Sequence, residues 1–244
     1  MKLERIYIST EPDKDYRVEY DKKSKRPSWL KIEGLNEKTL FVKIIINKEE
    51  FWYRKHLGKY FLPLKTTAED YEIYYDKIAS EYESIVPHNK ELALKIVGIL
   101  KKNKIKQNSE ILELGAGTGL IAEILAKNNY NNLTLVDISD EMLKLAKNKP
   151  SLKNCKFIKE NTLDFKTNKR FDVVYFCMHL DYFTDFETKH ILQSVKDVLN
   201  KDGLIIIVDR HIPKINNFKK IDSNDFIVTT EKMPLRYEYF AGRK

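Results

Sequence analysis

The hydrophobic and polar positions follow two different periods along the chain. Near the start, short segments rich in β-branched and aromatic residues predict β-strands at 6–8, 16–20 and 40–46. Pro63 then disfavours a continuing helix or central strand. We therefore expect a small β-rich extension over residues 1–65 and a larger domain over residues 66–244.

From Thr66 onward, the apolar residues recur at helical spacing. This pattern predicts one helix over 68–83, and a second over 92–100 that begins near Pro87, a residue suited to a helix N-terminus.

After Ser109, short apolar strands alternate with amphipathic helices. Strands are predicted at 111–114, 133–136, 156–158, 172–176, 203–208, 226–229 and 235–240, and helices at 120–126, 141–147 and 186–199. Because strands that alternate with helices form βαβ units, we expect a mostly parallel sheet covered on both faces.

A glycine-rich segment, Glu-Leu-Gly-Ala-Gly-Thr-Gly over 113–119, joins a predicted strand to a predicted helix. Gly115, Gly117 and Gly119 allow a tight turn and a close approach of the backbone to a ligand. The dinucleotide fingerprint needs its third glycine at the position of Leu120, so a pyrophosphate site is disfavoured. A phosphate-binding P-loop is excluded because no Gly-Lys-Ser/Thr follows.

Asp137 ends the next predicted strand. An acid at this position can accept hydrogen bonds from both ribose hydroxyls of an adenosine, and such charge-assisted bonds are strong. The alternative is that Asp137 simply caps the following helix, but Ser139 or Asp140 can fill that role.

These motifs resemble those of the class I S-adenosylmethionine (SAM)-dependent methyltransferases. The resemblance rests on 113–119, Asp137, Phe-Asp-Val-Val at 171–174 and the turn at 198–204. It covers the chain from about residue 70 onward, and its motifs are nearest to the ubiquinone-biosynthesis-type branch. It implies an α/β, Rossmann-like fold with a seven-stranded, mostly parallel sheet and helices on both faces. SAM would be the cofactor and S-adenosyl-L-homocysteine (SAH) the product.

The resemblance also implies roles for single residues. The loop glycines would lie alongside the methionine and ribose portions of the cofactor, and Asp137 would bind the ribose. Ile138 and Met142 would pack on the adenine. Asn161 stands where many relatives carry Asp, although an Asn can still donate or accept. The expected cofactor-binding residues are Tyr71, Tyr75, Glu113, Gly115, Ala116, Gly117, Gly119, Asp137, Ile138, Met142, Asn161, Thr162 and Cys177.

Tyr71 and Tyr75 enter that set because residues 75–82 resemble a Tyr-Asp-x-x-Ala-x-x-Tyr helix. In the family such a helix often covers the methionine end of the cofactor. The alternative is that the two aromatic rings only pack their helix against a sheet.

The acceptor side is expected at residues 177–183, directly after a strand, since ligands lie outside the carboxyl ends of strands in open α/β sheets. The segment lacks the Asn/Asp-Pro-Pro-Tyr/Phe motif that amino methyltransferases use to methylate nucleobases and glutamine. Its absence argues against methylation of an exocyclic base nitrogen. Methyl transfer needs alignment, and a base if the nucleophile carries a proton. His179, Asp181 and His211 are the candidate bases, with packing, helix capping and a rim position as their respective structural alternatives.

The composition bears on metal binding, on the cellular compartment and on membrane insertion. The two cysteines, Cys155 and Cys177, make neither a disulfide framework nor a metal site, so we expect no metal and a cytoplasmic protein. No apolar run approaches the roughly 20 residues of a membrane span, and the charged start is unlike a secretory signal.

The net charge of +8 is concentrated near the start, since residues 1–65 hold 16 Lys and Arg against 10 Asp and Glu. There, Trp29, Phe51, Trp52 and Tyr53 lie among basic residues. This mixture fits nucleic-acid binding, a lid over the acceptor, a homodimer contact, or plain packing of a solvated β layer.

The main functional hypothesis is a methyltransferase acting on a small molecule. The alternatives are an RNA or protein methyltransferase that docks through residues 1–65, and a non-catalytic module that binds SAM or nucleic acid. Aminopropyl transfer is a weaker fourth reading, because no paired acids are evident in the sequence.

Overall fold

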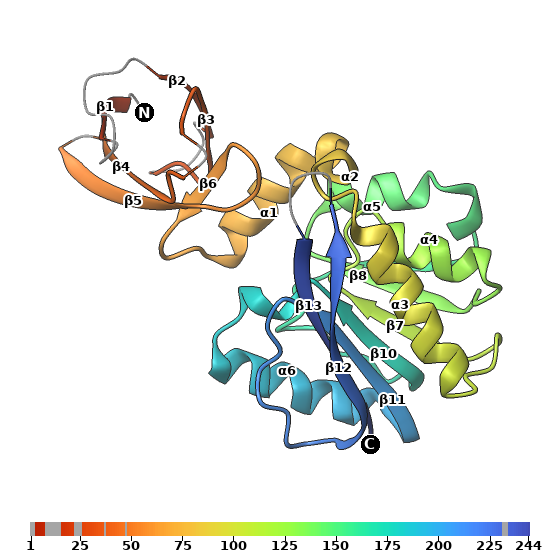
Figure 1. Ribbon diagram of the computed structural model, residues 1–244. Helices are drawn as coiled ribbons and strands as arrows, with labels where there is room; N and C mark the ends of the chain where they lie inside the picture. The colour runs from red at the N-terminus through yellow and green to blue at the C-terminus, as the bar shows by residue number, and fades with distance from the viewer. Residues whose placement is uncertain (1–2, 8–15, 22–25, 37, 47, 231–233) are drawn as a thin grey trace. The chain divides into compact units, whose positions relative to one another are not determined.

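The computed structural model of the chain comprises two compact units, Met1–Ile78 and Ala79–Lys244 (Figure 1). It describes residues 3–7, 16–21, 26–36, 38–46, 48–230 and 234–244. Helix α1 (Ala68–Ile78) belongs to the first unit, and the domain boundary expected after residue 65 stays a prediction.

The first unit is built on an antiparallel sheet that has six strands in the described part of the chain, in the order β1-β4-β5-β6-β3-β2. The strands are β1 (Leu3–Tyr7), β2 (Arg17–Tyr20), β3 (Leu30–Glu33), β4 (Phe41–Ile46), β5 (Glu49–Lys55) and β6 (Tyr60–Pro63). The sequence pattern predicted β1, β2 and β4 but not the other three. Ile8, predicted to be in a strand, lies outside the described residues.

The aromatic residues of this unit are divided between core and surface by strand alternation. Trp29 and Tyr53 are buried, and the Tyr53 hydroxyl donates to the Pro27 carbonyl at 2.7 Å. Phe51 is half-buried and Trp52, on the outer face of β5, is 48% exposed. Trp29 and Tyr53 therefore belong to the core, in line with the packing alternative, whereas Trp52 is exposed among the surface cations.

Helix α1 is fixed at its start by a reciprocal pair of hydrogen bonds. Asp70 accepts from the Thr67 backbone N–H at 2.8 Å, and the Thr67 hydroxyl accepts from the Asp70 N–H at 3.2 Å. Both Asp70 carboxylate oxygens also accept from Arg26, at 3.2 and 2.7 Å. Because Arg26 precedes β3, this bidentate pair ties the helix to the sheet within the first unit.

The second unit contains a seven-stranded sheet in the order β12-β13-β11-β10-β7-β8-β9. Its strands are β7 (Ile111–Leu114), β8 (Leu133–Asp137), β9 (Lys156–Lys159), β10 (Phe171–Cys177), β11 (Leu199–Asp209), β12 (Lys219–Thr229) and β13 (Pro234–Arg243). β11, β10, β7, β8 and β9 run parallel, whereas β13 is antiparallel to both of its neighbours. The predicted α/β fold with a mostly parallel sheet is confirmed.

Helices α2 and α3 precede β7, and the other helices of this unit connect its strands. The helices are α2 (Tyr82–Ile85), α3 (Asn89–Lys102), α4 (Leu120–Lys127), α5 (Asp140–Lys147) and α6 (Asp185–Val198), with 3-10 turns η1 (Ala79–Glu81), η2 (Pro150–Leu152) and η3 (Leu180–Tyr182). The single helix predicted over 68–83 is interrupted, because η1 separates α1 from α2. Among the described residues, no helix is long and apolar enough to cross a membrane.

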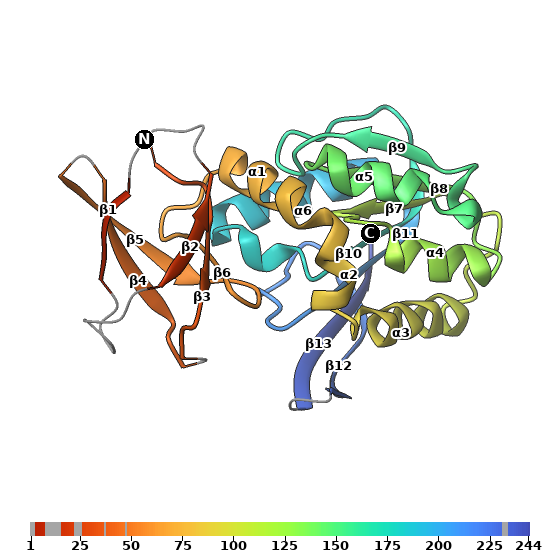
Figure 2. The same cartoon turned by 90° about the horizontal axis from the view of Figure 1, so that it is seen from above.

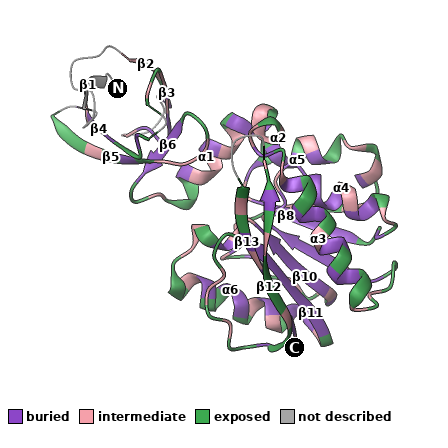
Figure 3. Ribbon diagram, in the orientation of Figure 1, coloured by how far each residue is buried: buried purple, intermediate pink, exposed green. Residues whose placement is uncertain are grey.

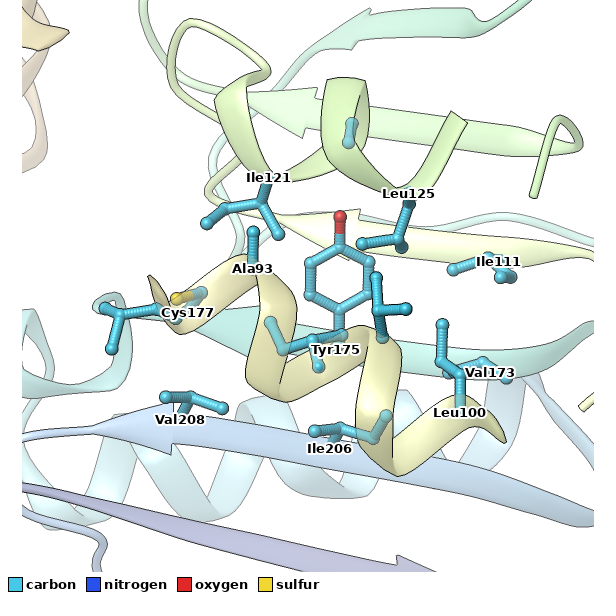
Figure 4. Close-up of a cluster of buried hydrophobic side chains, with 14 of the residues drawn as sticks. Ala93, Leu100, Ile111, Ile121, Leu125, Val173, Tyr175, Cys177, Ile206 and Val208 are labelled. Carbon is cyan, nitrogen blue, oxygen red and sulfur yellow. The ribbon is translucent and has the colours of Figure 1, made fainter. Parts of the chain in front are cut away.

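The sheet separates two hydrophobic clusters, as expected when both faces are covered (Figures 1 and 2). One cluster joins the sheet to α3 and α4, and the other joins it to α6. The central strands are buried along most of their length (Figure 3). Figure 4 shows the first cluster, where side chains of α3 and α4 surround the Tyr175 ring of β10. This rigid core carries the loops at the carboxyl ends of the parallel strands.

Candidate cofactor and acceptor site

The glycine loop follows β7 and leads into α4. Gly115, Gly117 and Gly119 all have positive φ, at 79°, 52° and 70°. Since residues with a Cβ rarely adopt this conformation, glycine is required at each turn of the loop. The N–H groups of Gly115 and Ala116 both donate to the Val136 carbonyl at 2.9 Å, which fastens the loop to β8.

Asp137, the last residue of β8, joins this loop to the next one. Its Oδ2 accepts from the Gly117 N–H at 2.7 Å and its Oδ1 accepts from the Ser139 N–H at 2.9 Å. The cap of α5 is Ser139, whose hydroxyl accepts from the Met142 N–H at 3.1 Å. Asp137 is therefore not needed as the helix cap.

Glu113 lies directly below the loop and pairs in register with Tyr175 of β10. Both side chains are fully buried, and within the described structure neither Glu113 Oε2 nor the Tyr175 hydroxyl has a partner at good hydrogen-bond geometry. Burial raises the pKa of Glu113 to about 8, and the Asp137 carboxylate adds to the rise. The nearby Tyr175 hydroxyl opposes this rise by interacting with the Glu113 carboxyl. A buried acid with a raised pKa beside a glycine loop fits a functional site.

His179 covers the other side of the loop. A Cβ on Gly115 would lie only 2.3 Å from Nδ1 of His179, so the imidazole rests against the glycine backbone. Its Nε2 lies 2.8 Å from the Thr162 hydroxyl, and the Phe183 ring packs edge-on at 5.2 Å. Burial lowers the pKa of His179 to about 4, so the ring is neutral at neutral pH.

Asp209, at the end of β11, holds the segment that carries His179. Its Oδ2 accepts from the N–H groups of His179 and Leu180, both at 3.1 Å, and its Oδ1 accepts from the Arg210 N–H at 2.8 Å. Asp209 is fully buried, and burial together with the Asp181 carboxyl raises its pKa to about 7. Sequence reasoning missed this residue, because its partners lie some 30 positions away.

Tyr82 is a second residue that the sequence interpretation missed. Its ring lies 3.7 Å from the place where a Gly117 Cβ would stand. Burial raises the pKa of its hydroxyl, with smaller contributions from Tyr182, Asp137 and Cys177. The signal was present in the sequence, since Tyr82 is the last tyrosine of the 75–82 pattern.

Helix α2, which carries Tyr82, is fastened to the glycine loop by polar contacts. Glu83 Oε1 accepts from the Thr118 hydroxyl and from Lys149 Nζ, both at 2.7 Å. Lys149 also donates to Glu123 on α4 at 3.1 Å. These contacts define the α2 clasp, namely Glu83, Thr118, Lys149 and Glu123.

The remaining expected cofactor residues of the second unit lie around the same edge. Ala116, Met142 and Cys177 are buried and Ile138 is half-buried. The Asn161 side-chain oxygen accepts from the Leu163 N–H at 3.1 Å, so the amide shapes its own turn. The structure thus brings the loop, strand ends and turns together as the motifs indicate, while the role of each residue stays a prediction.

Four expected site residues remain, namely Tyr71, Tyr75, His211 and Asp181. Tyr71 and Tyr75 belong to the first unit, where their rings pack near His56, and the Tyr75 hydroxyl lies 3.3 Å from His56 Nε2. His211 is exposed in the segment that follows β11. Asp181 is also exposed, although its carboxyl interacts with Asp209.

No group of three or more His, Cys, Asp or Glu side chains is placed to hold a metal ion in the part of the chain that the structure describes. The chemistry of the donors present suits an adenosine-bearing ligand: positive-φ glycines, an acid at a strand end and a buried acid below the loop. The fold is a Rossmann-like domain, and its glycine loop and strand-end acid lie where such domains bind their ligands.

Comparison with known proteins indicates which family of Rossmann-like domains this chain resembles. Residues 111–203 match a family described as a methyltransferase domain. The chain carries a class I SAM-dependent methyltransferase domain, as the resemblance of its motifs indicated.

Two curated relatives show how far the sequence similarity extends. An uncharacterized protein of Methanocaldococcus jannaschii is 35% identical over 162 residues, covering 61% of this chain and 58% of the relative. The ribosomal protein L11 methyltransferase of Caldicellulosiruptor saccharolyticus is 31% identical over 121 residues, covering 48% and 38%. The chain spans about half the length of the curated relatives that it matches.

Among solved structures, the magnesium protoporphyrin IX methyltransferase of Synechocystis with bound SAM superimposes with a TM-score of 0.60. Its sequence is 12% identical, and the match covers 72% of this chain and 96% of that one. At this identity the similarity shows the fold.

Proposed function

We propose that this protein binds SAM and transfers its methyl group to a small-molecule acceptor, releasing SAH. The observation that carries the proposal is the position of Asp137, whose carboxylate is joined by a 2.7 Å hydrogen bond to Gly117 in a loop of three positive-φ glycines. An acid at this strand end is suited to the two ribose hydroxyls of an adenosine.

Bound SAM supplies an electrophilic methyl group on a sulfonium, from which a nucleophile displaces a neutral thioether. The residues of this chain contribute alignment and exclusion of water. Gly115 and Gly117 allow close approach of the ligand to the backbone, Asp137 holds the ribose, and the buried Glu113 carboxyl lies directly below the loop. Tyr82 and His179 form the walls over the loop.

His179 is the candidate base that the geometry supports best. It lies against the glycine loop and is neutral at neutral pH, so it can take a proton from an acceptor. Asp181 and His211 are more exposed and lie farther along the acceptor side. Burial raises the pKa of Cys177 well above its usual value, so this thiol stays protonated and does not act as a nucleophile.

A small acceptor is supported by two observations. The segment after β10, Cys-Met-His-Leu at 177–180, lacks the Pro-Pro motif of amino methyltransferases. The structural neighbour from Synechocystis is named for a small-molecule acceptor, a magnesium porphyrin. A macromolecular acceptor is the alternative, since Trp52 and Phe41 are exposed on the first unit and one relative is named for a ribosomal protein. Salt-sensitive RNA binding would distinguish the two.

The direct test is calorimetry of SAM and SAH binding to the wild type and to Asp137→Ala. We expect micromolar affinity in the wild type and a loss of about 5- to 150-fold in the variant, the usual cost of removing a hydrogen bond to a charged group. Asp140→Ala is the matched control, because it removes an exposed acid three residues away that pairs with Lys159 instead. A wild type that binds neither ligand would contradict the proposal.

A further inference from the structure

We propose that Asp209 is a positioning residue of this site: its buried carboxylate holds the turn after β10 and thereby holds the His179 ring against Gly115. The effect of the His179 ring on cofactor binding rests on the proposed function. The hydrogen bonds by which Asp209 holds the turn are present in the protein without ligand.

The first argument is the hydrogen-bond pattern. One carboxylate oxygen accepts from two successive backbone N–H groups, those of His179 and Leu180, and the other oxygen accepts from Arg210. Three charge-assisted bonds to the main chain fix the position of a turn more firmly than a single side-chain contact does. Because Asp209 is fully buried, no water competes for these donors.

The second argument is the backbone that these bonds restrain. Met178, immediately before His179, has a φ of 54°, a left-handed conformation that is strained for a residue with a long side chain. Its N–H donates to the Val208 carbonyl at 2.9 Å, so β11 holds both sides of the strained residue. Such a conformation persists only where the surroundings impose it, and Asp209 supplies that restraint.

The third argument is that the turn places the His179 ring between Gly115 and Thr162. The His179 ring reaches Gly115 on one side and the Thr162 hydroxyl, 2.8 Å from Nε2, on the other. The hydrogen bonds of Asp209 go to the main chain of His179, Leu180 and Arg210. Its effect on the glycine loop is therefore transmitted through the main chain of residues 178–180.

The charged and titratable groups that face Asp209 come from three elements. Asp181 lies on η3, Cys177 on β10, and Tyr237 with Glu238 on β13, where Glu238 is the register partner of Asp209. Burial raises the pKa of both Cys177 and Tyr237, so these two groups stay neutral near pH 7. A titration near neutral pH therefore reports on the carboxyl of Asp209 beside Asp181.

The first test needs no variant and no cofactor. In an NMR titration over about pH 5.5 to 8.5, the amide protons of His179, Leu180 and Arg210 should shift together with one midpoint, since all three donate to one carboxyl. Asp181→Asn should lower that midpoint by removing the neighbouring charge, and His211→Gln excludes the nearby imidazole as the cause. Amides that titrate with separate midpoints would overturn the proposal.

The second test uses Asp209→Asn, which keeps the side-chain size but replaces one accepting oxygen with a donating NH2. We expect the imidazole ¹⁵N resonances of His179 to move and the SAH affinity to fall by about tenfold, the loss of roughly one charge-assisted hydrogen bond. Asp185→Asn, an exposed acid of the same unit, should change neither.

The outcomes separate the two proposals. If folded Asp209→Asn keeps the His179 resonances and SAH affinity of the wild type, Asp209 does not position the ring. If the wild type binds no SAH, the proposed function fails, and the amide titration and the imidazole resonances still decide on Asp209. If the variant does not fold, the titration of the wild type decides alone.

Discussion

Glu113 shows how a single residue couples the site to the stability of the domain. Its carboxyl is fully buried below the glycine loop, and burial raises its pKa from 4.5 to about 8. Between those pH values the folded protein holds a proton that the unfolded chain has released. The folded state therefore loses stability as pH rises through this window, because ionisation of the buried acid is unfavourable.

Replacing Glu113 with Gln should remove this dependence. Relative to Glu113→Gln, the wild type should lose up to about 1.4 kcal/mol of unfolding free energy for each unit of pH between 4.5 and about 8. Urea denaturation followed by far-UV circular dichroism at several pH values measures the difference. Glu141→Gln, which removes an exposed carboxyl, should leave the slope as in the wild type. Parallel curves for wild type and Glu113→Gln would contradict the burial argument.

Some residues of the site could be predicted from the sequence, and others could not. Gly115, Gly117 and Asp137 follow a local rule, since a strand, a glycine turn and a helix are consecutive in the chain. Tyr82 could have been found from the 75–82 pattern, of which it is the last tyrosine. Asp209 reaches His179 and Leu180 only through tertiary structure, so no local pattern identifies it.

At the scale of elements, α2 shows how a very short helix acquires a fixed place. It has only four residues and no side-chain cap, so its own hydrogen bonds hold it weakly. The α2 clasp compensates, because Glu83 receives hydrogen bonds from both Thr118 and Lys149. The position of Tyr82 over Gly117 depends on these contacts.

Glu83→Gln should therefore loosen α2 and weaken ligand binding. Since the Glu83 side chain is 41% exposed, we expect a cost of only about 1 kcal/mol, or roughly fivefold in SAH affinity. Hydrogen exchange of residues 82–85 should accelerate, and Glu91→Gln on α3 should leave that exchange unchanged. Unaltered exchange in 82–85 would show that the clasp does not hold the helix.

The elements differ in how well their sequence patterns predicted them. The strands and helices from β7 to α6 were predicted closely, because apolar strands buried on both faces and amphipathic helices give strong signals. β3, β5 and β6 were not predicted. Glu49, Glu50 and Arg54 interrupt the apolar pattern of β5, and β3 and β6 are only four residues long.

At the scale of the whole molecule, each unit has its own hydrophobic core, and both tryptophans of the chain lie in the first. Trp29 is buried and Trp52 is exposed. Tryptophan fluorescence therefore reports on the first unit alone, while the cofactor residues proposed here, apart from Tyr71 and Tyr75, lie in the second.

We expect the two units to unfold as separate transitions. SAH at 100 times its Kd should stabilise the second unit by about 2.7 kcal/mol, seen in the helical circular dichroism signal, and leave the tryptophan transition in place. Trp52→Phe isolates the signal of Trp29 as a control. A tryptophan transition that moves by the same amount with SAH would show that the two units unfold as one.

The contact of His179 with Gly115 also bears on how such a protein diversifies. The turn proposed to face the acceptor and the loop proposed to bind the cofactor meet through one imidazole ring, without a spacer between them. A lineage that acquires a new acceptor by changing residues 178–182 therefore alters its hold on the cofactor in the same step. Because the two segments share this contact, a change of acceptor preference is constrained by the need to keep cofactor binding. The substitutions that we expect to be tolerated are those that leave Asp209 and the main chain of the turn intact.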